Sequence, residues 1–79
     1  MRTIQKIVEV KEGRNWATSY TETNETEIYK SLATDLINKK IHAAAYIKSI
    51  KRIPNYDGTQ NITVTYDNDC RAVYTVADR

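Results

Sequence analysis

Alternating apolar and polar positions predict two strands at the start of the chain. Over residues 1–11, Ile4, Val8 and Val10 fall on one face of a strand, and Ile7 departs from the alternation. Residues 12–15 form a turn in which Gly13 supplies a positive φ. Residues 16–22 alternate again and are rich in threonine and aromatic residues, so the two segments form a hairpin. The polar positions of the first strand, Thr3, Gln5, Glu9 and Lys11, are expected on its opposite face.

Apolar residues at helical spacing predict one helix from about Glu25 to about Lys40. Asn24 is the expected N-cap, and Glu27 is placed to return a hydrogen bond to the N–H of the cap. Acidic residues in the first turn, and Lys39 and Lys40 in the last, suit the helix dipole. The apolar stripe comprises Ile28, Tyr29, Leu32, Ala33, Leu36 and Ile37, with Ile28, Leu32 and Leu36 buried. Lys30, Thr34, Asp35 and Asn38 are expected to face water.

The pattern of residues 42–53 is compatible with a strand and with a helix. Its isoleucines are three residues apart, as in a helix, but β-branched residues are dense and Pro54 follows. We expect a strand with a bulge near Lys48 and Ser49, because a bulge shifts the alternation by one residue. A second helix is the alternative.

Two further strands follow a loop that turns at Asp57 and Gly58. Residues 61–66 and 70–76 alternate regularly, and the turn 67–69 joins them into a second hairpin. The chain is therefore expected to be a single α+β domain over residues 1–79, with element order ββαβββ. One helix covers one face of an antiparallel sheet of about five strands, and the other face stays in contact with water.

The composition indicates the cellular compartment of the protein and the source of its gene. A single cysteine, Cys70, rules out an internal disulfide and favours a reducing cytoplasm. Residues 1–10 have no signal-peptide apolar region, and no apolar run approaches the roughly 20 residues of a membrane span. Amino acids with AT-rich codons (Ile, Lys, Asn, Tyr and Met) number 29, against 15 of Gly, Ala, Arg and Pro. The gene therefore resembles those of low-GC bacteria, their phages or mobile elements.

No residue pattern indicates catalysis, a metal site or a bound cofactor. His42 is the only histidine and has no acid or cysteine at ligand spacing. Cys70 follows an acidic turn, which does not activate a thiol. The turn 67–69 resembles the start of a calcium loop, but Arg71 occupies the third ligand position. We expect no enzymatic activity.

One stretch carries most of the positive charge. Residues 30–52 hold six basic residues against Asp35 alone, although the net charge of the whole chain is only +2. Basic side chains beside an aromatic ring are typical of single-strand nucleic-acid binding, whereas lysines on an edge strand prevent unwanted strand pairing. We favour the edge-strand interpretation. The candidate binding patch comprises Lys39, Lys40, Tyr46, Lys48, Lys51 and Arg52.

The expected function is a small non-enzymatic protein–protein interaction module, an accessory or inhibitor protein that binds another protein or its own copy. All seven aromatic residues are tyrosine or tryptophan, the aromatic residues that carry a polar group and are enriched at interfaces. The alternatives are a nucleic-acid-binding module that uses the basic stretch 39–52, and a structural homo-oligomer.

Overall fold

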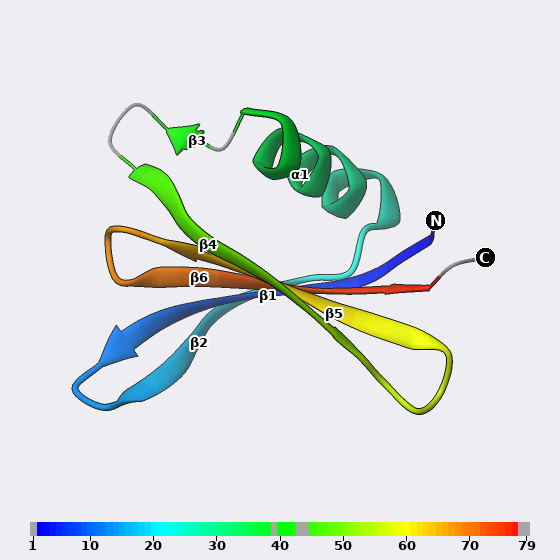
Figure 1. Ribbon diagram of the computed structural model, residues 1–79, viewed down its shortest axis with the longest axis horizontal. Helices are drawn as coiled ribbons and strands as arrows, with labels where there is room; N and C mark the ends of the chain where they lie inside the picture. The colour runs from blue at the N-terminus through cyan, green and yellow to red at the C-terminus, as the bar shows by residue number, and fades with distance from the viewer. Residues whose placement is uncertain (1, 39, 43–44, 78–79) are drawn as a thin grey trace.

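The computed structural model describes residues 2–38, 40–42 and 45–77, with side chains for residues 2–35 and 47–77. These residues contain one helix and six strands (Figure 1). They are β1 (Arg2–Glu12), β2 (Asn15–Glu22), α1 (Glu25–Asn38), β3 (Lys40–His42), β4 (Ala45–Pro54), β5 (Thr59–Tyr66) and β6 (Cys70–Ala77).

The strands form one antiparallel sheet in the order β2-β1-β6-β5-β4-β3, and α1 lies over one face of it (Figure 1). The α+β class with one helix on one face of the sheet is therefore confirmed. The five longer strands are those that the alternation predicted. The sixth, β3, is only three residues long and runs from the predicted end of the helix at Lys40 to the predicted start of the next strand at His42.

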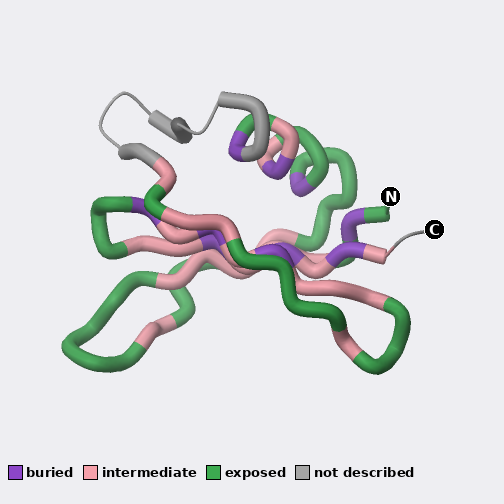
Figure 2. Tube along the Cα trace, viewed as in Figure 1, coloured by how far each residue is buried: buried purple, intermediate pink, exposed green. Residues whose placement is uncertain are grey.

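The core lies between α1 and the two central strands. Ile28 and Leu32 of the helix are at most 1% exposed, as predicted. They pack with alternate residues of β5 and β6, and Figure 2 shows the buried positions on the strands beneath the helix and on its inner side. Tyr29, predicted in the apolar stripe, is 54% exposed, because it follows the buried Ile28 and falls outside the side of the helix that contacts the sheet. The predicted burial of Leu36 lies outside the described side chains. The buried strand residues are Ile62, Val64, Tyr66, Ala72, Tyr74 and Val76.

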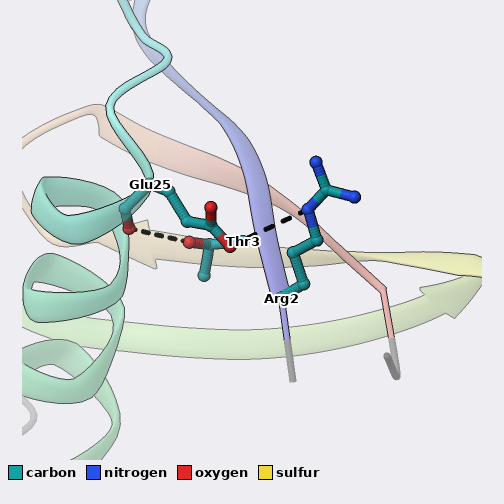
Figure 3. Close-up of polar contacts among 3 residues, drawn as sticks. All are labelled: Arg2, Thr3 and Glu25. Carbon is teal, nitrogen blue, oxygen red and sulfur yellow. Dashed lines mark hydrogen bonds and ion pairs between the residues drawn. The ribbon is translucent and has the colours of Figure 1, made fainter.

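An irregularity in β1 changes which side chains face the helix. The register with β6 shifts between Thr3 and Gln5, so Thr3 lies opposite Val76 on the helix side. The expectation that Thr3 faces water is wrong. Its side chain is 3% exposed, and its hydroxyl donates to the carbonyl of Glu25 at 2.8 Å (Figure 3). Arg2 Nε lies 3.8 Å from the carboxylate of the same glutamate, so two contacts attach the start of the helix to β1.

Within the predicted segment 42–53, residues 45–53 belong to β4, a strand with the predicted bulge. The register of β4 on β5 shifts between Ile47 and Ser49, so Lys48 is the extra residue. The helix alternative is excluded. The strand begins at Ala45 rather than at His42, because residues 40–42 form a separate short strand that pairs with its start. The helix ends at Asn38, so Lys40 belongs to β3 and not to the last helical turn.

The turns and the helix cap follow local chemistry. Gly13 and Gly58 both have positive φ, and β5 pairs with β6 across the predicted hairpin. The Oδ1 of Asn24 accepts the N–H of Glu27 at 3.1 Å, which confirms the N-cap. The predicted hydrogen bond from the N–H of Asn24 to Glu27 is wrong. This N–H donates to Oε2 of Glu22 at 3.2 Å.

Candidate functional site

The basic patch divides between the two faces of the sheet. Lys51 lies opposite Thr63, on the face away from the helix, whereas Arg52 lies opposite Ile62, on the helix side. Lys48 is at the bulge, and all three basic side chains are exposed. Lys39 lies outside the described residues, as do the side chains of Lys40 and Tyr46. The described part of the patch is therefore an edge with positive charge on both faces, not a single basic surface.

Of the two residues with reactive side chains, Cys70 and His42, only Cys70 has a described side chain. Cys70 is a free, half-buried thiol that packs against the core from the start of β6. The side chain of His42 lies outside the described residues. Within the described part of the chain, no three His, Cys, Asp or Glu side chains come close enough together to hold a metal ion.

A buried polar cluster lies under the helix and was not predicted. Asp35 was expected to face water, but it is 1% exposed. Its Oδ2 accepts two hydrogen bonds, from the hydroxyl of Tyr66 at 2.7 Å and from that of Tyr74 at 2.5 Å. Asp35 is seven residues after Ile28 and three after Leu32, so it belongs to the buried stripe of the helix. The carboxylate therefore joins α1 to β5 and β6.

Two more side chains extend this cluster towards β1. The hydroxyl of Ser31 shares a hydrogen bond of 2.9 Å with that of Tyr74, and Lys6 Nζ donates to Ser31 Oγ at 2.5 Å. Burial lowers the pKa of Lys6, an effect that the nearby Asp35 carboxylate partly opposes. Burial, followed by the hydrogen bond to Asp35, raises the pKa of both tyrosines above the ordinary value.

The polar cluster is better explained as structural than as catalytic. No buried side-chain nitrogen or oxygen among the described residues lacks a hydrogen-bond partner, so these groups satisfy one another. The adjacent hollow on the helix flank has a volume of about 260 Å³ and is lined by Glu27, Lys30, Ser31, Thr34 and Asp35. It is smaller than ordinary ligand pockets of about 300–1,000 Å³, and no apolar residue lines it.

The face of the sheet opposite α1 is not covered by any described element, and we call it the open face (Figure 1). At its centre Ile7 lies opposite Val73, which in turn lies opposite Thr63. Threonine, serine, asparagine and glutamine occupy most of the surrounding positions, as the sequence predicted for a face in contact with water. They are Gln5, Thr18, Thr21, Ser49, Asn61, Thr65 and Thr75.

A cluster of three side chains lies on the open face over β2, β1 and β6. Arg71 Nε donates to Glu9 Oε1 at 2.7 Å, and the indole ring of Trp16 covers the guanidinium, with its centroid 4.3 Å from Cζ. The side chains of Arg71 and Glu9 are only 29% and 17% exposed. The ion pair and the ring together hold the arginine in one place. Sequence reasoning missed this cluster because it depends on the pairing of β1 with β6, which brings together Glu9 and Arg71, 62 positions apart in the chain.

None of the helices in the described part of the chain is long and apolar enough to cross a membrane. Comparison of the chain with protein-family models, with curated proteins and with solved structures gave no match.

Proposed function

We propose that the protein is a non-enzymatic protein–protein interaction module whose contact surface is the open face of the sheet. One observation carries the proposal: the apolar pair Ile7 and Val73 lies within a polar border, beside a tryptophan that covers a paired arginine. Protein interfaces have the same arrangement, with an apolar centre and a polar rim. The codon composition is typical of a low-GC bacterium, phage or mobile element, and the role that we propose there is that of an accessory or inhibitor protein.

The Trp16–Arg71–Glu9 cluster suits a binding surface energetically. Tryptophan and arginine are the residue types most enriched among those that dominate binding energy. Arg71 is already fixed by Glu9 and Trp16. Binding therefore costs little additional side-chain entropy at this position, which favours affinity.

The arrangement of charge favours a protein partner over nucleic acid. A nucleic-acid strand that lies on the sheet needs its basic contacts on one face, but Lys51 and Arg52 alternate between the two faces. On the open face the guanidinium of Arg71 is already paired with Glu9. The basic stretch therefore supports the nucleic-acid alternative less well than its sequence suggested.

The test is a comparison of two charge insertions. A partner is first captured from a cell extract with the wild-type chain, and its affinity is then measured for Val73→Lys and Tyr29→Lys. Val73 is at the centre of the open face, while Tyr29 is an exposed residue of the helix, on the other side of the molecule. We expect Val73→Lys to weaken the complex about 30-fold or more, because an unpaired charge is buried in the interface. Tyr29→Lys is expected to bind as the wild type does.

Three controls make the result interpretable. Urea denaturation of both variants establishes that each is folded. Sedimentation velocity of the wild type and of Val73→Lys tests whether the partner is a second copy of the chain. Capture after nuclease treatment separates a protein partner from nucleic acid. Equal affinity of wild type and Val73→Lys, or a complex lost on nuclease treatment, would contradict the proposal.

A further inference from the structure

Among the described residues, the outer edge of β4 is unpaired beyond the bulge. β3 pairs only with Ala45 and Tyr46, at the start of the strand. From Ser49 to Pro54 the inner edge pairs with β5 in unbroken register, and no described strand pairs with the outer edge. The backbone N–H and C=O groups on that outer edge are therefore available to an added strand.

This edge carries concentrated positive charge. Lys48, Lys51 and Arg52 are all exposed, and the sequence has no acidic residue from position 36 to position 56. Arg2 and Arg71 both form ion pairs, but none of these three does so within the described part of the chain. Like charges opposite one another are unfavourable across strands, so a second copy of β4 does not suit this edge.

The alternation of charge specifies the sequence of the strand that does suit it. Residues opposite Lys51 and Arg52 in an added strand are neighbours in sequence, one on each face. Both must be acidic to pair with the two cations. Ile53 shares the open face with Lys51 and is 56% exposed, so an apolar residue beside the acidic pair would cover it.

We propose that the outer edge of β4 binds an extended acidic segment of a protein partner, which adds to the sheet as a further strand. The segment contains two adjacent acidic residues with an apolar residue next to them. This inference rests on the proposed protein-binding function and names the chemistry of the partner. Positive charge on both faces of the edge argues against a single basic surface that binds phosphates. It matches an added strand, because the side chains of a strand alternate between the same two faces.

The probe is a capped ten-residue peptide rich in threonine and valine, with an isoleucine followed by two adjacent glutamates. One comparison peptide replaces both glutamates with glutamine. The other separates them by one residue, which places both on the same face. Amide hydrogen exchange of residues 49–53 reports strand addition, and fluorescence anisotropy of the labelled peptide reports affinity.

We expect the probe to protect amides within residues 49–53, since added backbone hydrogen bonds slow their exchange. The glutamine peptide is expected to bind about ten-fold more weakly, because it lacks both cross-strand charge pairs. The peptide with separated glutamates should have intermediate affinity, because it retains one pair. Binding without amide protection, or equal affinity for all three peptides, would overturn the proposal.

A charge exchange gives the second test. The double variant Lys51→Glu with Arg52→Glu should lose the acidic peptide and bind one with two adjacent lysines. Lys11→Glu with Lys30→Glu makes the same change of net charge at exposed sites away from this edge, and should bind the acidic peptide as before. Loss of binding in both double variants would mean that only net charge matters. Tighter binding of a single-stranded oligonucleotide than of the peptide would favour nucleic acid. Either outcome would overturn the proposal.

The two proposals fail separately. Val73→Lys changes the centre of the open face and leaves the β4 edge intact, so it should not change the affinity for the acidic peptide. If the peptide binds the β4 edge while Val73→Lys has no effect on the captured partner, the open-face proposal fails alone. If Val73→Lys weakens the captured complex while no peptide protects residues 49–53, the edge proposal fails alone.

Discussion

Removing the two tyrosine hydroxyls that bind Asp35 should cost most of the stability of the domain. A hydrogen bond to a charged group contributes about 1.5–3 kcal/mol, so Tyr66→Phe alone should lower the free energy of unfolding by that amount. The double variant Tyr66→Phe with Tyr74→Phe leaves a carboxylate that is 1% exposed without either donor. A buried charge that has lost its hydrogen-bond donors costs about 3–5 kcal/mol, which is comparable to the whole stability of a domain of this size.

A third substitution tests the explanation. Adding Asp35→Leu to the double variant removes the charge together with its donors, so an apolar cluster of similar volume should recover most of the lost stability. Urea denaturation measures each step, and a loss of about 2 kcal/mol moves the midpoint by about 1–2 M. Tyr56→Phe, at a fully exposed ring, is the control and should change stability by less than about 0.5 kcal/mol. If the triple variant is no more stable than the double one, the buried charge is not the cause.

Three other results are expected. Leu32→Ala should lower the free energy of unfolding by about 2–5 kcal/mol in denaturant melts, since the side chain is 1% exposed in the core, and a loss under about 1 kcal/mol would argue against this packing. Asn24→Ala should cost about 0.5–2 kcal/mol through the lost cap, measured in the same way, and an unchanged midpoint would show that the cap contributes nothing. Tyr66 and Tyr74 have a raised pKa in the folded chain, so the stability that they contribute is complete below pH 10.0, their ordinary pKa, and is lost as the pH rises above it. Ultraviolet difference spectra should show these two rings ionising only as the domain unfolds, and their ionisation in the folded protein would contradict the burial of their hydroxyls.

The elements that the sequence predicts correctly are those fixed by local patterns. The apolar spacing of Ile28 and Leu32 sets the inner side of the helix, and the positive φ at Gly13 sets a turn. The bulge at Lys48 is also a local signal, because the apolar residues of β4 change phase there. The same alternation, once the bulge is known, places Lys51 and Arg52 on opposite faces and divides the basic patch.

The features that the sequence does not predict depend on distant partners. A charged Asp35 within an apolar stripe is interpreted as solvated unless Tyr66 and Tyr74 are known to lie beneath it. The burial of Thr3 depends on an irregularity in strand pairing, not on its own neighbours in sequence. The contact of Trp16 with Arg71 likewise needs β1 to lie between β2 and β6 in the sheet, which no local pattern specifies.

Cross-saturation between a captured partner and the methyl groups of this chain tests the open-face proposal most directly. The protein is methyl-labelled, the partner is saturated, and intensity losses are read at Ile7 and Val73 on the open face and at Ile28 and Leu32 under the helix. We expect strong losses at Ile7 and Val73 and none at Ile28 and Leu32. A complex in which Ile7 and Val73 keep full intensity would contradict binding through the open face.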